Sequence, residues 1–469
     1  MGTPRLTLSP MARLLRARDL LATLIACGAL LCVGQPAFGD GFRNPFHDAA
    51  AIGQGNAFTA QADNASAVFY NPAGMTALPG VQVAGGAQFV HVHTKYTNSA
   101  GQTTTNTAPT VGLPPPSQVF ITARLKDLGI TGLGELSAGF GVQNLYGFAA
   151  KFPVGGPLNT AVTFAQLPLI AIKPTLAYKL SDSLSIGLGA DIYTFASFLG
   201  EGQAERQFQA SPASGFPPGT ALELSGAGTT AGLNASLLWT PLRNDEGKPL
   251  LSLAGVWRSQ AVLPLNGGLH ANGALVANAA TSARLPEVWT GGLAYWPIRH
   301  HEREWKVEVD VDYVRWQAIR NADVHLSNGG VLPNPQQWNN AVSISVGTEY
   351  KWLGIPDAPA WDLAVRSGYI RSHTPVTDLS FDPAYADSDA HVATVGAGFL
   401  CRKGGTLLGL IQCASGSTGL LARQAFGLDV AYQAIMFDHR TVTQNPNPAV
   451  NGNYRSMNHA GSVTFRATF

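Results

Sequence analysis

The 469-residue sequence has few charged residues, and this shortage argues against an ordinary soluble protein. Asp, Glu, Lys and Arg make up only 13% of the chain, about half of their share in a typical soluble protein. So few charges cannot solvate a large surface. Yet no segment after residue 40 approaches the roughly 20 consecutive apolar residues of a membrane-spanning helix. Low charge without helical spans is typical of a membrane β-barrel, whose backbone groups pair between strands.

Net charge and cysteine are scarce as well. The formal charge is +1, and residues 1–39 hold four Arg and one Asp, so the remainder is near −2. This balance points to no nucleic acid or acidic partner. Of the four cysteines, Cys27 and Cys32 lie in residues 1–39. In an oxidising compartment, the remaining Cys401 and Cys413 are expected to form one disulfide that closes a short loop, because further metal ligands are missing around them.

Residues 1–39 have the three regions of a secretory signal peptide. Three arginines precede an apolar run from Leu20 to Val33, and Ala37 and Gly39 then offer a small-x-small cleavage site before Asp40. The run is too short for a membrane anchor. The stretch LIAC, which ends at Cys27, is an alternative lipoprotein cleavage site. Cleavage after Gly39 would deliver the mature chain to the cell envelope.

Period-two alternation is the strongest pattern in the rest of the chain. In WKVEVDVDY, residues 305, 307, 309, 311 and 313 are apolar or aromatic, and the residues between them are Lys306, Glu308, Asp310 and Asp312. Similar segments recur over 169–180, 341–352, 426–437 and 462–469. Soluble sheets alternate too, but about fourteen such segments follow from Val81 onward. This repetition predicts an all-β protein, a transmembrane antiparallel β-barrel of about fourteen strands.

The lengths of the connections support the barrel. Longer loops rich in Gly, Pro and Asn are expected near 98–116, 148–168, 198–223, 264–284, 319–340, 374–388 and 438–456. Shorter turns are expected near 126–134, 181–183, 241–249, 297–304 and 353–360, and the turn near 402–422 is a long exception that holds the cysteine pair. Long loops on one side and short turns on the other are typical of the outer membrane. Five tryptophans border the short turns, where an aromatic girdle is expected: Trp239, Trp296, Trp305, Trp352 and Trp361.

Residues 40–80 do not fit the barrel pattern. They are rich in small residues, lack alternation and carry apolar side chains without charges to solvate them. A barrel of fourteen strands leaves a lumen that its own side chains do not fill. We therefore expect a signal peptide over 1–39, an N-terminal hatch (a plug in the lumen) over 40–80, and the barrel over 81–469.

Three stretches carry a family resemblance. The segment AIGQGNAFTAQADNASAVFYNPAGMT (Ala51–Thr76) resembles the N-terminal signature of FadL-type outer-membrane transporters of long-chain fatty acids, whose relatives carry aromatic hydrocarbons. LSAGFGVQNLYG (Leu136–Gly147) is similar to the third strand of that family, and LPEVWTGGLAYWP with EWKVEVDVDYVRW to its paired later strands. The resemblance spans essentially the whole mature chain.

This resemblance implies a hatch-plugged barrel of fourteen strands and a route for ligands. An extracellular apolar groove would capture the ligand, a pocket beside the hatch would hold it, and a kink in the third strand would open the barrel wall for sideways exit. Asn71, Pro72 and Ala73 would belong to the hatch, and Phe42 to its apolar tip. Gly139, Gly141 and Gly147 would lie on the kinked strand.

A fatty acid also brings a carboxylate, which needs a cation or donors. On the first strand, alternation predicts that Val90, Val92 and Tyr96 face lipid and that His91, His93 and Lys95 face the lumen. Lys173 is expected on a lumen face as well. Alternatively, these cations pair with Glu308, Asp310 or Asp312 inside a polar barrel. Two histidines without a third ligand do not indicate a metal site.

The sequence thus predicts passive uptake of hydrophobic compounds, most directly long-chain fatty acids, across the outer membrane of a Gram-negative bacterium by a monomer without cofactor. Aromatic hydrocarbon uptake by the same fold is the first alternative, and a surface adhesin or structural barrel is the second. The sequence contains neither a nucleophile elbow nor a zinc-protease motif, so an enzyme is not indicated.

Overall fold

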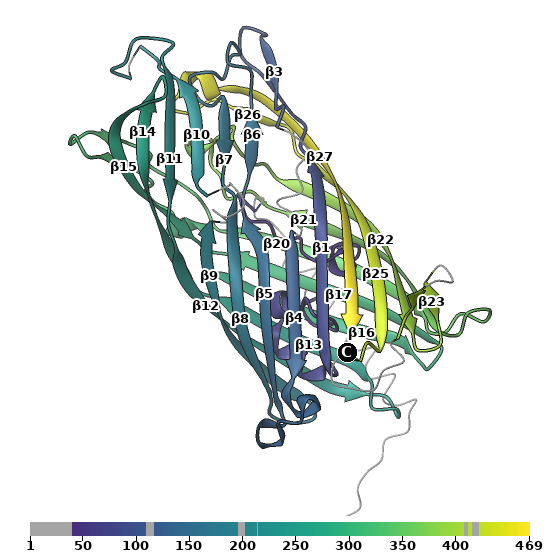
Figure 1. Cartoon of the computed structure of the whole chain (residues 1–469). Helices are drawn as coiled ribbons and strands as arrows, with labels where there is room; N and C mark the ends of the chain where they lie inside the picture. The colour runs from purple at the N-terminus through teal and green to yellow at the C-terminus, as the bar shows by residue number, and fades with distance from the viewer. Residues whose placement is uncertain (1–39, 109–116, 196–201, 213, 408–410, 415–421) are drawn as a thin grey trace, which may run out of the picture. The chain divides into compact units, whose positions relative to one another are not determined.

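A computed structural model describes residues 40–469 except 109–116, 196–201, 213, 408–410 and 415–421, so the predicted signal peptide lies outside the described residues. Within these limits, fourteen strands form a closed antiparallel barrel, which confirms the predicted fold class (Figure 1). In chain order they are β1 (Val81–His91), β4 (Gln118–Arg124), β5 (Leu136–Tyr146), β8 (Leu169–Lys179), β9 (Leu184–Phe195), β12 (Thr230–Arg243), β13 (Pro249–Arg258), β16 (Val288–Arg299), β17 (Arg303–Val314), β20 (Ala341–Trp352), β21 (Trp361–Ser372), β22 (Ala390–Arg402), β25 (Ala425–Phe437) and β27 (Gly452–Thr468).

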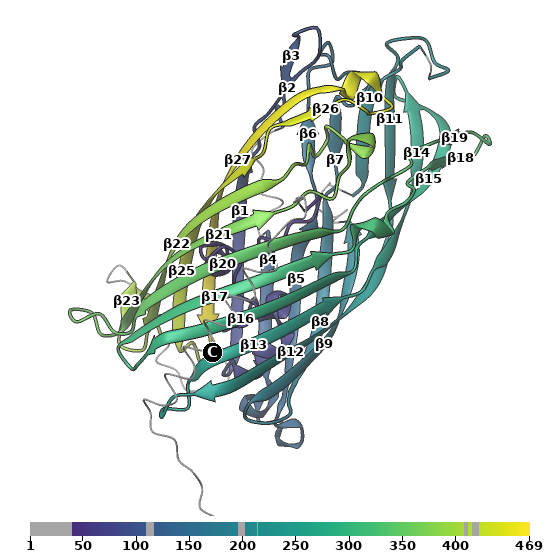
Figure 2. The ribbon, with the colours of Figure 1, turned by 180° about the vertical axis from the view of Figure 1, so that it is seen from behind.

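Pairing of the first and last strands closes the barrel. Each of the fourteen strands pairs with the next, and β27 pairs with β1 from Gln82↔Thr468 to His91↔His459. Closure leaves no free sheet edge, so the backbone donors and acceptors of every strand have partners without water. Figure 2 shows β13, β16, β17 and β20 side by side in the wall on the opposite face.

Side chains alternate between the two faces of the wall as the sequence predicted. On β17, Trp305, Val309, Val311 and Tyr313 are exposed on the outer face, whereas Lys306, Glu308 and Asp310 are buried inside. On β8, Leu176 and Tyr178 point outward, and Lys173, Thr175 and Ala177 point inward.

The segment before β1 is almost entirely buried and packs within the barrel. It contains α2 (Ala49–Ile52), α3 (Ala67–Tyr70) and the 3₁₀ helix η1 (Pro72–Ala77). The α2 helix contacts β22, β25 and β27, whereas η1 contacts β8, β9 and β12, so the segment bridges opposite walls. We call residues 40–80 the hatch. Among the described residues, no helix is both long and apolar enough to span a membrane.

Small residues let the hatch approach the wall closely. A Cβ at Gly368 would lie 2.3 Å from the backbone carbon of Gln54, and one at Gly347 would lie 2.0 Å from the Gln54 oxygen. Only glycine fits on the wall at such separations. Small residues are therefore needed in the wall strands β20 and β21, where the hatch backbone at Gln54 and Gly55 packs against them.

The long loops hold more strand than the sequence suggested. Eight strands form a second sheet in the order β19 (Val331–Leu332), β18 (Val324–Leu326), β15 (Ala274–Leu285), β14 (Ala261–Ala271), β11 (Ala221–Ala227), β10 (Ala204–Gln209), β7 (Phe164–Gln166) and β6 (Ala149–Lys151). The range 264–284, expected as a loop, is mostly a hairpin. Its turn is Asn272-Gly273, with both residues at positive φ. Pro264 and a glycine pair led to the prediction of a loop where β14 lies. The Asn-Gly dipeptide, however, is a strong hairpin signal.

Four of the five tryptophans near the short turns are exposed to some extent, and one is not. Trp239 and Trp305 are exposed, Trp352 and Trp361 are partly exposed, and Trp296 is buried. The prediction for Trp296 was wrong. A register shift between Tyr295 and Ile298 interrupts the alternation, and Trp296 packs against the Arg299 guanidinium and beside Ala60 of the hatch.

Candidate functional site

The hatch tip pairs with the upper end of the third barrel strand, β5. The Asn44 N–H donates to the Leu145 carbonyl at 2.7 Å, the Gly147 N–H donates to the Phe42 carbonyl at 3.0 Å, and Arg43 bridges Tyr146. Residues 143–146 are buried in succession instead of alternately. Since both faces of this segment are covered, the end of β5 has left the plane of the wall and turned toward the lumen.

The geometry of the neighbouring strands makes room for this kink. The ladder between β4 and β5 ends at Gln118↔Gln143, and the ladder between β5 and β8 shifts register between Gln143 and Tyr146. Pairing between β1 and β4 also stops at Gly86↔Gln118, although β1 continues to His91. Among the described residues, the wall therefore has fewer strand-to-strand hydrogen bonds at this height than lower on the same strands.

The three glycines expected on the kinked strand serve close packing. A Cβ at Gly139 would lie 2.4 Å from Met75 Sδ and 2.8 Å from Val68 Cγ2, both in the hatch, and a Cβ at Gly141 would lie 2.9 Å from the Phe120 ring. Gly147 follows the kink, where a Cβ would lie 2.8 Å from the Leu167 carbonyl.

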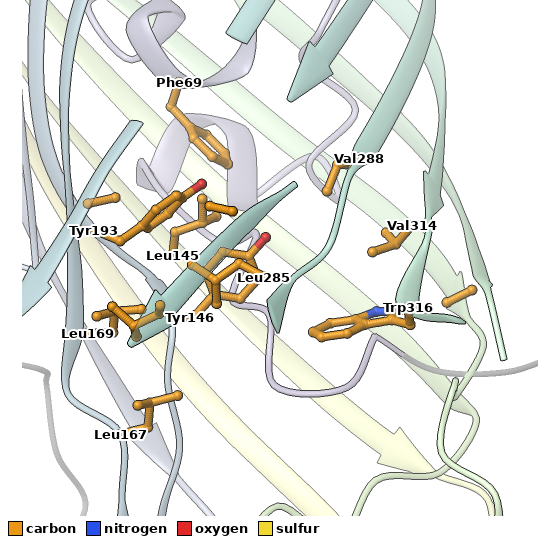
Figure 3. Close-up of a cluster of buried hydrophobic side chains, with 14 of the residues drawn as sticks. Phe69, Leu145, Tyr146, Leu167, Leu169, Tyr193, Leu285, Val288, Val314 and Trp316 are labelled. Carbon is orange, nitrogen blue, oxygen red and sulfur yellow. The ribbon is translucent and has the colours of Figure 1, made fainter. Parts of the chain in front are cut away.

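An aromatic cluster surrounds the side chain of Phe42 at the hatch tip. Five rings lie with centroids 4.9–6.3 Å from its own: Tyr146, Phe148, Trp316, Trp338 and Tyr385. They come from the kinked strand, its following loop and two other extracellular connections. Figure 3 shows the adjoining apolar cluster, which contains Phe69 of the hatch and Leu145, Leu169 and Tyr193 of the wall.

A cavity of about 290 Å³ lies between the hatch tip and the barrel wall. Hatch residues 40, 41 and 43–47, together with Phe69 and Tyr70, border it on one side, whereas the Phe42 ring lies in the aromatic cluster and does not line the cavity. Apolar wall residues border it on the other: Val90, Val92, Ile370, Val392, Ile435 and Phe437. The cavity thus combines an apolar wall with a polar border that contains Arg43, Arg258 and Asp312.

The structure contradicts the predicted orientation of the first strand above residue 88. Val90 and Val92 line the cavity, whereas His91, His93 and Lys95 are exposed on the outer face and Tyr96 is buried. The prediction assumed that the polar face of a strand points inward. That rule holds where lipid surrounds the barrel, but near the extracellular end the outer face meets water and the inner face meets an apolar cavity. None of these three cations therefore lies on the cavity.

Lys173 does face the lumen, as predicted, but it is neutralised there. Its buried ammonium forms an ion pair with Asp191, which also accepts a hydrogen bond from the Asn234 amide at 2.9 Å. Lys173 thus pairs with a carboxylate inside the barrel, as the alternative reading held, but with Asp191 and not with the acids of β17.

Those acids hold the hatch instead. Asp310 accepts from the N–H groups of Phe58 and Thr59, at 3.0 and 2.9 Å, and Glu308 accepts from that of Ala60 at 2.6 Å. The ammonium of Lys306 donates to the Ala57 carbonyl at 2.9 Å. Farther up β17, Asp312 accepts from Arg43 at 2.9 Å. The inner face of β17 is therefore a row of charged groups that binds the hatch backbone.

Asn71, Pro72 and Ala73 anchor the base of the hatch. The Asn71 amide donates to the carbonyls of Thr59 and Leu237, and the Ala73 N–H donates to Ser236 Oγ at 3.0 Å. Pro72 packs against Gly187, and a Cβ added at Gly187 would lie 2.6 Å from the Cβ of Pro72. This turn is apolar because it packs inside the barrel, directly after Phe69 and Tyr70 of the cavity border.

Arg258, at the upper end of β13, is the cation that sequence reasoning missed. It is buried, borders the cavity, donates to the Phe69 carbonyl and lies 4.7 Å from the centre of the Phe69 ring. Among the residues that the structure describes, no carboxylate lies within ion-pair distance of it, and its buried Nε–H has no acceptor. No pattern around Arg258 in the sequence separates it from other arginines.

Two titratable groups at the cavity have shifted pKa values. Burial raises the pKa of Asp387, in the connection between β21 and β22, to about 7, although Thr374 and the Gly41 N–H donate to it. Burial, with Arg43 nearby, lowers the pKa of His47 in the hatch to about 3, so this imidazole is neutral at physiological pH.

The predicted disulfide lies apart from the cavity. A disulfide joins Cys401 and Cys413 in the turn after β22, with Cα atoms 5.6 Å apart. As for metals, the described part of the chain contains no group of three or more His, Cys, Asp or Glu residues that could hold an ion.

Comparisons with known proteins agree with this architecture. A family model described as outer membrane protein transport protein (OMPP1/FadL/TodX) matches residues 30–407. The chain is similar to a FadL homologue from Pseudomonas aeruginosa, with 15% identity and a TM-score of 0.69 over 92% of this chain and 100% of that one. It is also similar to the toluene transporter TodX from Pseudomonas putida (14%, 0.58, 92% and 100%) and to the toluene transporter TbuX from Ralstonia pickettii (12%, 0.56, 92% and 98%). At such identities these structures show the fold alone. No curated protein sequence matches the chain.

Proposed function

Because the chain belongs to the FadL/TodX family of outer-membrane transport proteins, we propose that the hydrophobic compounds it transports are long-chain fatty acids. The ligand carboxylate would bind Arg258, and the acyl chain would lie along the apolar wall of the cavity. The outer membrane supplies no ATP, so movement would be passive and would involve no catalytic step.

The single observation that supports an acid over a neutral hydrocarbon is the unpaired guanidinium of Arg258. A buried charge without a partner is costly, and a carboxylate is the ligand that a guanidinium binds most strongly, often through two parallel hydrogen bonds. Other buried cations at the lumen, Lys173, Lys306 and Arg366, already have carboxylate partners. An apolar cavity for toluene alone would not need this charge.

The apolar wall supplies the affinity for the acyl chain. Each methylene that leaves water contributes about 0.8 kcal/mol. Val90 of β1, Val92 just after it, and Ile435 and Phe437 of β25 offer apolar surface to the chain. Affinity of this kind needs no energy source to draw the ligand from water.

The exit would lie sideways, through the wall beside β5. Here β4 is only seven residues long, and the ladder between β1 and β4 covers only residues 81–86 of β1. The upper part of the wall between β1 and β5 is therefore the place where an acyl chain could pass into lipid without breaking a long ladder of hydrogen bonds.

Uptake of labelled oleate and of toluene in a deletion strain tests this proposal. Complementation with the wild-type protein should restore oleate uptake. Arg258→Gln keeps a donor for the Phe69 carbonyl but removes the charge. It should reduce oleate uptake at least about tenfold, because one charge-assisted hydrogen bond to the carboxylate is lost. Arg455→Gln, which removes an exposed arginine on β27, is the matched control and should have no effect.

The outcomes distinguish the competing functions. Restoration of toluene uptake alone would replace the fatty acid by an aromatic hydrocarbon. If neither compound enters faster with the protein present, the transport proposal fails, and a surface adhesin or structural barrel becomes the better reading.

A further inference from the structure

A polar hollow of about 340 Å³ lies on the outer face of the extracellular sheet, away from the transport cavity. It is bordered by residues 280–282 and 284 of β15 and by residues 320–323 and 325, which lead into and enter β18. Ala280 and His325 are directly opposite each other on these two strands. On β15, Ala283 and Leu285 pack toward the apolar core, so the alternate residues Ser282 and Arg284 face outward.

The hollow has an excess of positive charge. Arg284, Arg320 and His325 border it, and all three are exposed. Within the described residues, neither arginine has an ion pair or a side-chain hydrogen bond. The carboxylate at the hollow, Asp323, already accepts from the Asn334 N–H at 2.5 Å and from the Asn321 amide at 2.8 Å.

A third arginine at the same rim of the barrel does have a carboxylate partner in the described chain, unlike Arg284 and Arg320. Arg315, at the end of β17, forms an ion pair with Glu287 at 2.5 Å. Glu287 also accepts from the indole N–H groups of Trp257 and Trp289. The chain thus neutralises a cation at the outer rim of the barrel but leaves Arg284 and Arg320 free, a few residues away.

The depth of the hollow suggests what fills it. Trp257 pairs with Trp289, and Trp289 with Tyr313, in adjacent positions on β13, β16 and β17, and these aromatic residues mark the outer membrane boundary. Arg284 precedes Trp289 by five residues, which span at most about 18 Å of extended chain. Arg320 follows Tyr313 by seven residues, at most about 25 Å of extended chain, so both arginines are within reach of the phosphorylated headgroups of the outer leaflet.

We propose that Arg284, Arg320 and His325 bind a phosphate group of the lipopolysaccharide that surrounds the barrel. Two unpaired guanidinium groups match the charge and geometry of a phosphate, which arginine binds through two parallel hydrogen bonds. Ser282, on the same outward face as Arg284, borders the hollow and supplies a hydroxyl group. The bound lipid would fix the extracellular sheet against the membrane surface. This site depends on the location in the outer membrane and not on which compound is transported.

The test measures binding of bisphosphorylated lipid A to the purified full-length mature protein in neutral detergent by native mass spectrometry. The Arg284→Gln/Arg320→Gln double variant should bind this lipid at least about tenfold more weakly, because it loses two charge-assisted contacts. The matched control is Lys95→Gln/Arg455→Gln. It removes two exposed cations that lie directly opposite each other on β2 (Thr94–Thr97) and β27, and it should bind as the wild type does.

Further arms separate the sources of phosphate. Lipid A without phosphate groups should bind the wild type and the double variant equally. Inorganic phosphate in excess should not displace the lipid. If it does, the site binds free phosphate, and the proposal of a lipid ligand is overturned. Arg284→Lys/Arg320→Lys keeps both charges but loses the planar forks, so it should bind lipid A more weakly than the wild type and more tightly than the Gln double variant. Heat-modifiable gel mobility shows that the barrel of each variant is folded. Equal affinity of the wild type and the Gln double variant, an equal loss in the control, or an equal loss in the Lys variant would contradict the proposal.

Discussion

Two buried cations of the lumen, Lys173 and Arg258, have opposite situations that composition alone could not reveal. Asp191 neutralises Lys173, whereas no carboxylate of the described chain reaches Arg258. The neighbouring strand makes the difference for Lys173, since Asp191 comes from β9, which pairs directly with β8. The proposed ligand site therefore rests on the charge that the described chain leaves unpaired, and not on the type of residue.

At the same scale, the contact between Gly41 and Asp387 should make hatch-tip docking depend on pH. Burial beneath the docked tip raises the pKa of Asp387 to about 7 from the ordinary 3.8, although the Gly41 N–H by itself favours the ionised carboxylate. A carboxyl group with a raised pKa binds its proton more tightly in the docked state, so docking is strongest below about pH 4 and weakens as the pH rises toward 7. Hydrogen exchange of residues 41–47, corrected for the intrinsic pH dependence, should therefore be faster at pH 8 than at pH 5.

The Asp387→Asn variant is the control for this effect. Its amide oxygen can still accept from the Gly41 N–H, but it does not titrate. The corrected exchange rates of the variant should be nearly the same at both pH values. A wild-type protein without pH dependence, or a variant that keeps it, would show that Asp387 does not control the tip.

At the scale of the elements, the sequence predicted strands well where one face meets lipid and the other meets charged groups. The alternation of β17 was read correctly because lipid surrounds it and the hatch backbone needs its acids. The upper part of β1 was read in reverse, because Val90 and Val92 line an apolar cavity while His91 and His93 meet water. Arg258 could not be found in the sequence, because its isolation depends on contacts between strands that are distant in the chain.

The glycines of the wall give a prediction for hatch packing. In Gly368→Ala the new Cβ would lie only 2.3 Å from the backbone carbonyl carbon of Gln54 and from the backbone nitrogen of Gly55, so the hatch must move. We expect docking to weaken by about 1–3 kcal/mol, the usual cost of overpacking. The measurement is protease cleavage within the hatch, which should become faster.

The matched control is Gly291→Ala on β16, where a Cβ would have no neighbour within 4 Å. This variant should resist protease as the wild type does. Equal resistance of the Gly368 variant would mean that the wall does not hold the hatch through this contact.

At the scale of the whole molecule, barrel and hatch divide the tasks of the protein. The barrel closes through β1 and β27 without the hatch, while the hatch, the kinked end of β5 and the extracellular connections together form the cavity. Deletion of residues 40–75 should therefore leave a folded barrel with heat-modifiable mobility but should change the permeation of hydrophobic compounds. Unchanged flux of every such compound in the deletion variant would contradict a role for the hatch in transport.

The central claim is that the cavity recognises a carboxylate on a long apolar chain. Equilibrium binding of oleate and of its neutral analogue oleyl alcohol, measured on the purified wild-type protein and on Arg258→Gln, tests it most directly. We predict that the wild type binds oleate about tenfold more tightly than the alcohol, as a charge-assisted hydrogen bond requires, and that the variant binds both alike. Equal binding of the two compounds by the wild type, or an undiminished preference for oleate in Arg258→Gln, would contradict the account.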